Sequence, residues 1–330
     1  MIRSILASAL VALALNAVPA HAQRDVATDA QPALDDRYPN RITAWPGGVT
    51  SLADVTYHTI PGYRPQILDV YMPPRGAGAK PLVIYIHGGG WVTGHTRQAG
   101  AISDFPALLA RLAGEGFVVA SVEYRLSGEV PFPAQLQDVR AALRFLKANA
   151  ARYGIDPARV GLWGGSAGGH LTALAALSCG VGALDAPGTK APAGTECVQA
   201  AVAWYGVFDV PALVAARPAG ADGAIAKLLG CTGPCPADKL AAASPVTYID
   251  AQDPPMLLIH GTDDQTVPVA QTHIAEARLR AAGVPVQAIY IPGADHSFIG
   301  KTPAATHAAT VQAVNATFDF LHARLDAPTH

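Results

Sequence analysis

One serine of the chain stands in a sequence context that is typical of a nucleophile. Ser166 lies in the segment Gly-Gly-Ser-Ala-Gly-Gly, residues 164–169, between an apolar run at 160–163 and a helix-like stretch at 171–177. Glycines two positions before and after a serine allow the close backbone approach that a sharp strand-to-helix turn requires. The helix would direct its first N–H groups toward an anion formed there. We predict a nucleophile elbow, although the Gly-x-Ser-x-Gly pattern alone also fits a simple turn.

A second glycine-rich segment, upstream of the serine, strengthens this prediction. The sequence His-Gly-Gly-Gly-Trp, residues 87–91, follows the strand-like residues 82–86, where a loop of oxyanion donors belongs. We expect the backbone N–H groups of Gly88, Gly89 and Ala167 to hold the oxyanion of a tetrahedral intermediate. The two segments together predict acyl-transfer chemistry.

The serine hydroxyl needs a base to take its proton, and that base needs an acid to hold its tautomer. The acid and the histidine are expected to follow the serine in that order along the chain. Asp264 lies in a loop after the strand-like residues 256–259, and His296 lies in a loop after the strand-like residues 286–291. We predict that Asp264 is the acid and that His296 is the general base.

Other residues near strand ends remain alternatives or have structural interpretations. Two further aspartates could supply the acid, the first being the closest rival: Asp263 and Asp209. Two histidines each end a strand before a glycine and are interpreted as loop-fixing residues without a catalytic role: His87 and His260. Two tryptophans could wall an acyl or aromatic pocket, or could equally be core residues: Trp91 and Trp204.

The elements that must position these residues alternate between strand-like and helix-like segments. An opening hairpin is predicted from residues 55–57 and 68–71, and six sheet strands are predicted at 81–86, 117–122, 159–163, 198–204, 256–259 and 286–291. The apolar residues of 135–150 recur at spacings of three and four, as they do near the C-terminus, which predicts amphipathic helices. Uniformly apolar strands between such helices predict an α/β fold, with a mostly parallel sheet covered on both faces. Two insertions, 180–196 and 207–250, are expected to form a small lid over the ligand crevice.

The N-terminal residues predict export. Arg3, the apolar stretch 5–18 and the small-x-small sequence at 20–22 are typical of a signal peptide, which we expect to be cleaved after Ala22. The apolar stretch is shorter than the roughly 20 residues that span a membrane, so we expect no stable membrane anchor and a periplasmic or secreted protein. Residues 23–45 are predicted to form a linker or N-terminal arm, and residues 46–330 a single catalytic domain.

Composition limits the partners and the redox state of the chain. The net charge of −2 and the 15% of charged residues include no basic excess, which excludes a nucleic-acid partner. Four cysteines in an exported chain predict two disulfides, and of three possible connectivities we favour the one that joins neighbours in sequence. That connectivity pairs Cys179 with Cys197 and Cys231 with Cys235. Zinc needs four ligands, and only the second pair is closely spaced, so no metal is expected.

As a set, these segments resemble the α/β-hydrolase superfamily. The resemblance is to its hormone-sensitive-lipase-like branch and to the bacterial feruloyl and acetylxylan esterases, the BD-FAE-like relatives. It spans roughly residues 50–325. It rests on residues 87–91, on Glu-Tyr-Arg-Leu at 123–126, on 164–170, on 260–268 and on His296.

The resemblance implies a serine carboxylic ester hydrolase that acts without a cofactor through Ser166, Asp264 and His296. Its substrate would be a small-molecule or oligosaccharide ester. Many lipase-like members have aspartate before the serine, whereas this chain has Gly165, which resembles the carbohydrate-esterase relatives. This difference favours short-chain, acetyl or feruloyl esters from plant polysaccharides. An amidase, formamidase or peptidase on the same fold, and a non-catalytic ligand-binding protein, remain alternatives, and the sequence does not indicate the oligomeric state.

Overall fold

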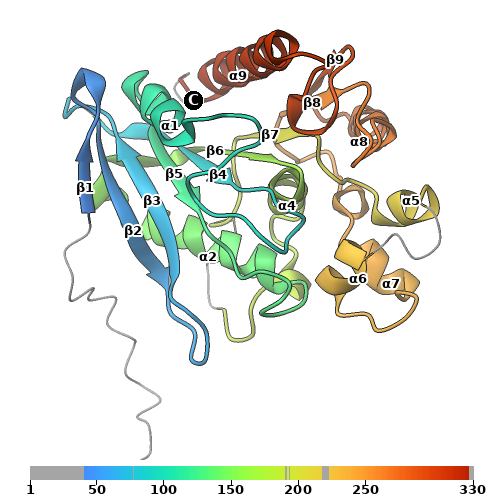
Figure 1. Ribbon diagram of the computed structural model, residues 1–330. Coiled ribbons are helices and arrows are strands. Elements are labelled where there is room, and N and C mark those ends of the chain that lie inside the picture. The colour runs from blue at the N-terminus through green and yellow to red at the C-terminus, as the bar shows by residue number, and fades with distance from the viewer. Residues whose placement is uncertain (1–40, 77, 190–191, 193, 218–222, 327–330) are drawn as a thin grey trace, which may run out of the picture. The chain divides into compact units, whose positions relative to one another are not determined.

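The structure, a computed structural model, describes residues 41–76, 78–189, 192, 194–217 and 223–326 (Figure 1). The predicted signal peptide and most of the predicted linker lie outside these residues. Among the described residues, no helix combines the length and the apolar character that a membrane crossing requires.

Nine strands of the described chain form one sheet, in the order β1-β2-β3-β5-β4-β6-β7-β8-β9. From β5 to β9 the strands are parallel, and β1, β2 and β3 join them antiparallel. The strand bounds are β1 Arg41–Ala44, β2 Thr50–His58, β3 Gln66–Met72, β4 Lys80–Ile86, β5 Val118–Val122, β6 Ile155–Gly165, β7 Ala200–Trp204, β8 Met256–Gly261 and β9 Val286–Ile291. The predicted hairpin and all six predicted sheet strands are present.

Helices cover both faces of this sheet (Figure 1). Buried side chains of α1 and α9 form a core with one face, and those of α2, α4 and α8 form a core with the other. The helix bounds are α1 Phe105–Gly114, α2 Ala134–Ala148, α3 Ala150–Tyr153, α4 Ala167–Leu177, α5 Val210–Ala215, α6 Gly223–Leu229, α7 Ala237–Ala242, α8 Ala270–Ala281 and α9 Pro303–Leu325. The α/β prediction is confirmed, and the parallel strands are apolar because both of their faces are buried.

The last residues of the predicted linker or arm lie against the domain as a strand. Residues 41–44, assigned to the linker or arm, form β1, whose residues pair antiparallel with 50–53 of β2. β1 has four residues and exposes most of its side chains, so the sequence contains no alternating pattern that would reveal it. Its position is determined by pairing with β2.

Both expected disulfides are present. Cys179–Cys197 closes the first insertion, between the end of α4 and the start of β7, and Cys231–Cys235 closes a short loop between α6 and α7. In a chain-entropy model, such links stabilise the fold by restricting the unfolded state, and the longer loop contributes more.

Candidate active site

Ser166 occupies a strained turn between β6 and α4. Its φ of 57° and ψ of −121° lie outside the regions that non-glycine residues favour, and such a conformation costs about 1–3 kcal/mol. The turn is tight because α4 starts directly beneath β4, and a Cβ on Gly168 would lie 2.0 Å from the carbonyl oxygen of Ile86. The glycines of the predicted elbow therefore allow a backbone contact that no side chain would permit.

A chain of hydrogen bonds connects this serine to the two residues predicted with it. Ser166 Oγ lies 2.9 Å from His296 Nε2, and His296 Nδ1 lies 2.8 Å from Asp264 Oδ2. Asp295 couples the two loops, because its Oδ1 accepts from the backbone N–H groups of His296 and Gln265. The structure thus brings Ser166, His296 and Asp264 together in the order that proton transfer from the serine requires.

The carboxylate of Asp264 is buried and accepts hydrogen bonds at both of its oxygens. Its Oδ1 accepts from the backbone N–H groups of Thr266 at 2.9 Å and Val267 at 2.8 Å. Burial alone would raise the pKa of Asp264, but hydrogen bonds from His260 and His296 lower that pKa below its ordinary value. Asp264 therefore stays ionised and can hold His296 in the tautomer whose Nε2 accepts the serine proton.

The rival aspartates lie elsewhere. Asp263 is exposed and accepts from the hydroxyl of Thr262. Asp209 caps the N-terminus of α5, where its side chain accepts from the backbone N–H of Ala212. Neither carboxylate has a hydrogen bond to His296.

The glycine-rich loop after β4 lies directly beside Ser166. A Cβ on Gly88 would lie 2.8 Å from the carbonyl oxygen of Gly165 and 3.4 Å from Ser166 Cβ. Among the described residues, no protein acceptor takes the backbone N–H groups of Gly88, Gly89 or Ala167. Three unpaired donors beside a nucleophile are the arrangement that stabilises an oxyanion.

Comparison with known proteins identifies the family at this point. The family model BD-FAE matches residues 68–279, which include the glycine-rich loop, Ser166 and Asp264. The chain belongs to the BD-FAE family.

Relatives of this BD-FAE family member include proteins described as esterases. It is 33% identical over 261 residues to Esterase LipQ of Mycobacterium tuberculosis, an alignment that covers 74% of this chain and 57% of LipQ. The chain thus spans little more than half the length of such curated relatives. Among solved structures, it resembles a truncated carbohydrate esterase from gut microbiota, with 29% identity, a TM-score of 0.69 and coverage of 84% of this chain and 96% of that one. A bifunctional GH43-CE protein of Bacteroides eggerthii is 32% identical, with a TM-score of 0.70 and coverage of 83% of this chain and 38% of that one.

In this BD-FAE family member, a buried aromatic contact holds the base of the glycine-rich loop. The His87 ring stacks on Tyr124 at 4.3 Å between centroids, and the Tyr124 hydroxyl donates to the His87 carbonyl at 3.1 Å. Burial lowers the pKa of His87 to about 4, so the ring is neutral near pH 7. The interpretation of His87 as a loop-fixing residue agrees with these contacts.

A second anchor holds the far end of the same loop. The Thr96 hydroxyl donates to Asp69 Oδ2 at 2.9 Å, and Ser121 Oγ donates to the Thr96 carbonyl at 2.6 Å. The Arg97 guanidinium donates to both oxygens of Asp69, which is buried in β3. The loop is therefore fixed to the sheet at both ends.

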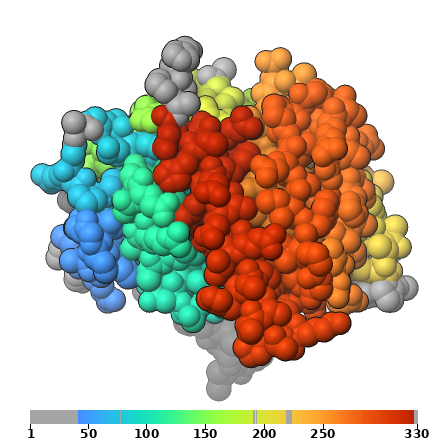
Figure 2. Space-filling model, turned by 90° about the horizontal axis from the view of Figure 1, so that it is seen from above, coloured from blue at the N-terminus to red at the C-terminus, as the bar shows by residue number. Residues whose placement is uncertain are grey.

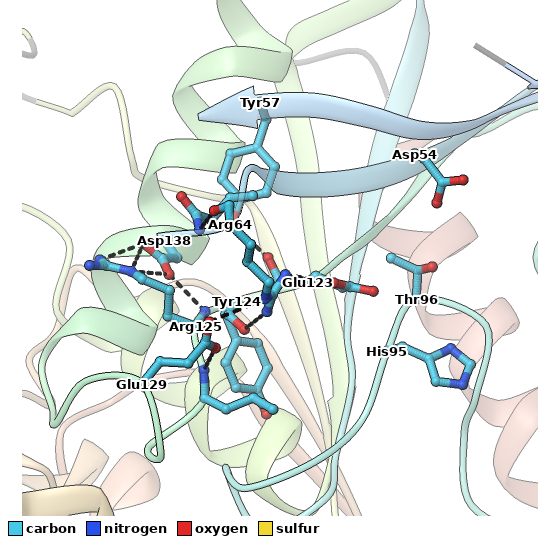
Figure 3. Close-up of polar contacts among 12 residues, drawn as sticks. Asp54, Tyr57, Arg64, His95, Thr96, Glu123, Tyr124, Arg125, Glu129 and Asp138 are labelled. Carbon is cyan, nitrogen blue, oxygen red and sulfur yellow. Dashed lines mark hydrogen bonds and ion pairs between the residues drawn. The ribbon is translucent and has the colours of Figure 1, made fainter. Parts of the chain in front are cut away.

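A polar cluster surrounds the Glu-Tyr-Arg-Leu segment, residues 123–126 (Figure 3). Arg64, from the loop between β2 and β3, donates to Glu123 at 2.8 Å, to Glu129 at 3.2 Å and to the Tyr124 carbonyl at 3.1 Å. Arg125 forms a buried ion pair with Asp138 of α2 at 2.7 Å. These contacts position Tyr124, and Tyr124 in turn supports the glycine-rich loop.

A cavity of about 380 Å³ opens at Ser166. Its lining is built largely of backbone and short polar side chains: Tyr85, Gly88, Gly89, Gly90, Thr93, Gly94, Gln98, Ala99, Gly100, Gly165, Ser166, Tyr205, Thr266, His296 and Ser297. The cavity is small, and more of its surface is apolar than polar.

Tyr205 is a member of this lining that the sequence did not reveal. It follows β7, its ring meets the His296 ring edge-on at 4.8 Å, and a Cβ on Gly165 would lie 2.9 Å from its hydroxyl. The tyrosine ring thus fills the space that an aspartate before the serine would occupy. Its position at the carboxyl end of the strand next to β6 was the available signal.

The two tryptophans considered for the pocket are core residues. Trp204 is 1% exposed, meets Trp163 at 4.9 Å and donates from Nε1 to the hydroxyl of Thr317. Trp91 is 4% exposed and donates from Nε1 to His170 Nδ1 at 3.1 Å. Neither is among the residues that line the cavity at Ser166.

The expected lid is not seen at this cavity. Among the described residues, neither insertion, 180–196 or 207–250, contributes to the lining. The second insertion forms α5, α6 and α7, and the carbonyl of Ala243, just after α7, accepts from His170 Nε2 at 2.7 Å. That insertion therefore packs beside α4.

A second cavity, of about 780 Å³, lies between α1 and α9. Figure 2 shows this face of the molecule, with α9 in red beside α1 in green. The two cavities share no lining residue, but successive parts of the same two loops line them: 98–100 and 296–297 at Ser166, and 101–104 and 300–303 between the helices.

In the part of the chain that the structure describes, no group of three or more His, Cys, Asp or Glu side chains is arranged to hold a metal ion.

Proposed function

We propose that this chain is a serine carboxylic ester hydrolase that acts through an acyl-enzyme at Ser166. One observation carries the proposal: hydrogen bonds connect Asp264 through His296 to Ser166, and three unpaired backbone N–H groups lie beside this serine. The esterase names of its BD-FAE relatives support the same activity.

In this mechanism, His296 Nε2 takes the Ser166 proton as Oγ attacks the ester carbonyl. The backbone N–H groups of Gly88, Gly89 and Ala167 stabilise the oxyanion that forms, and Asp264 stabilises the imidazolium. His296 then returns the proton to the leaving alcohol. Water activated by the same imidazole releases the acid from Ser166.

The proposed substrates are short-chain esters, in particular acetyl or feruloyl esters of plant polysaccharide fragments. The small volume of the cavity, about 380 Å³, supports a short acyl group. Likeness to a carbohydrate esterase from gut microbiota supports the same class. The glycine before Ser166, packed against Tyr205, also agrees with this resemblance.

We also propose export to the periplasm or the medium. The signal-like residues 1–22 and the two disulfides support this location, because disulfides persist in oxidising compartments. N-terminal sequencing of the mature protein tests it, with Gln23 as the expected first residue.

The activity is tested by kcat/KM on acetylated xylo-oligosaccharide, methyl ferulate and p-nitrophenyl esters from acetate to octanoate. We expect Ser166→Ala to lower kcat by about 10⁴-fold or more while the fold is retained. Unchanged hydrolysis by a folded Ser166→Ala variant would reject the proposal. Matched formyl amines and dipeptide amides belong in the panel, since a higher kcat/KM on them would assign an amidase instead.

A further inference from the structure

A second histidine lies directly behind Asp264. His260, at the end of β8, is fully buried, and its Nε2 lies 3.2 Å from Asp264 Oδ2 and 2.8 Å from the carbonyl oxygen of Val267. Its Nδ1 lies 2.6 Å from the hydroxyl oxygen of Thr272 in α8. The ring is thus held between the Asp264 loop and a helix of the scaffold.

The partners of His260 define its tautomer. Both groups that face Nε2 are acceptors, a carboxylate and a carbonyl, so Nε2 carries the hydrogen. The Thr272 hydroxyl then donates to Nδ1, and the hydroxyl is the only partner of this nitrogen among the described residues. Thr272 therefore fixes the orientation in which His260 donates toward Asp264.

With His260 included, donors lie beside both oxygens of Asp264. Two backbone N–H groups bind Oδ1 and His296 Nδ1 binds Oδ2, while the single N–H of His260 Nε2 lies between the Val267 carbonyl oxygen at 2.8 Å and Asp264 Oδ2 at 3.2 Å. The carboxylate therefore cannot rotate without losing hydrogen bonds to Thr266, Val267 or His296 and its contact with His260.

We propose that His260 is a positioning residue for the reaction: it orients the Asp264 carboxylate and takes up part of its charge, and so sets how strongly Asp264 stabilises the His296 imidazolium. This inference rests on the proposed function, since it assigns a role within the same site. It also gives the His-Gly pair at 260–261 a role in the chemistry beyond fixing a loop.

The contact between His260 and Asp264 affects the charge that His296 meets at Asp264 Oδ2. A donor that shares Oδ2 reduces the negative charge available to the His296 imidazolium. Loss of that donor should stabilise the imidazolium and raise the pH at which His296 becomes active as a base. Two other titratable side chains of the described residues lie beside His296: Tyr205, whose ring meets it edge-on, and Asp295, whose Oδ1 accepts from the His296 backbone N–H. Both remain in place in the variants below.

The test measures the pH profile of Ser166 phosphonylation by a serine-directed phosphonate, together with ester turnover, in His260→Phe and His260→Gln. His260→Phe removes the N–H, and we expect the acid limb to move up by about half a pH unit and the plateau rate to fall about 10-fold. His260→Gln places an amide N–H near the former Nε2 and should restore the wild-type limb. Thr272→Val, which removes only the hydroxyl, should move the limb the same way by less and remains informative if His260→Phe does not fold.

An acid limb that stays at the wild-type pH in His260→Phe or in Thr272→Val would overturn the proposal, even if stability falls, because a purely structural residue would give that result. Phosphonylation separates this failure from failure of the proposed function. Wild type that reacts with the phosphonate at Ser166 but hydrolyses no ester would reject the esterase activity, while the limb shift would still report on His260.

Discussion

The two sides of Ser166 are built from different groups. On one side, His296, Asp264 and His260 form a row of ionisable side chains that exchange or hold protons. On the other side, the loop 88–91 presents backbone N–H groups, which have no charge state to adjust. The first side is therefore expected to depend on pH and side-chain identity, and the second on backbone conformation.

The supports behind the two sides differ in the same way. Asp264 is held by hydrogen bonds that converge on a single carboxylate. The glycine-rich loop is held at its ends by the Tyr124 contact and by the Thr96–Asp69 anchor. Substitutions on the first side should therefore lower activity by removing charge, and substitutions on the second side by displacing the backbone.

The largest effect is expected on the ionisable side. Asp264→Asn keeps the shape of the side chain but removes the charge that fixes the His296 tautomer, so kcat should fall by about 10⁴-fold. The measurement is kcat on p-nitrophenyl acetate. Asp263→Asn is the matched control, because it makes the same change on an exposed neighbour, and its kcat should stay within about 2-fold of wild type. Equal losses in both variants would contradict the assignment of Asp264.

A smaller effect is expected on the backbone side. Gly89 has a φ of +111°, and a Cβ there would lie 2.1 Å from the carbonyl oxygen of Thr93. Gly89→Ala must therefore displace the loop, and loss of an oxyanion donor should lower kcat by about 10²–10³-fold without moving the acid limb of the pH profile.

Gly62→Ala is the control for this change. Gly62 also has a positive φ, +86°, but a Cβ there has no neighbour within 4 Å, so it carries the conformational cost without the collision. If Gly62→Ala keeps full activity while Gly89→Ala loses activity, the loss is caused by displacement of the Gly89 N–H group. A shifted acid limb in Gly89→Ala would show that the two sides do not act separately.

The smallest effect is expected on the free energy of unfolding. It tests whether the contacts that hold the glycine-rich loop are insensitive to pH. His170 Nδ1 accepts from Trp91 Nε1, and His170 Nε2 donates to the Ala243 carbonyl, so the neutral ring joins the glycine-rich loop to the second insertion. Burial lowers the pKa of His170 to about 4, compared with an ordinary value of about 6.5. Between these values the unfolded chain binds a proton that the folded chain does not, so stability is complete above pH 6.5 and declines toward pH 4.

This shift of the His170 pKa corresponds to a loss on the order of 3 kcal/mol in the free energy of unfolding when the pH falls below 4. Thermal unfolding followed by circular dichroism from pH 8 to pH 4 measures it, with His170→Gln as the comparison. The variant should have a lower Tm at pH 8 and a shallower decline in acid. Parallel curves for the two proteins would show that His170 does not cause the decline.

The local sequence pattern was sufficient to predict site residues that lie in turns with a required glycine spacing. Ser166 and Gly88 are recognisable because their turns require glycine neighbours at fixed spacing. Asp264 and His296 follow from chain order and from the ends of two apolar strands. The sequence favoured Asp264 but left Asp263 as its closest rival, because spacing alone does not show which of two adjacent loop residues faces the histidine.

The features that the sequence did not reveal depend on contacts between distant segments. Tyr205 reaches the site only because β7 lies next to β6, so that its ring meets Gly165. Trp204, one residue earlier, is 1% exposed and packs in the core against Trp163. Both insertions were expected over the site because they follow strand ends. The second insertion, 207–250, instead packs beside α4.

The aromatic side chains that run from the core to His296 give the protein an internal optical reporter. Trp163 meets Trp204, Trp204 meets Phe298 at 5.2 Å, and Tyr205 meets both Phe298 and the His296 ring. Because Trp204 is buried and adjoins the segment that carries His296, its fluorescence emission should shift when that segment is displaced. Binding of a ligand at Ser166, or acid release of the histidine loop, can therefore be followed by intrinsic fluorescence in the unlabelled protein.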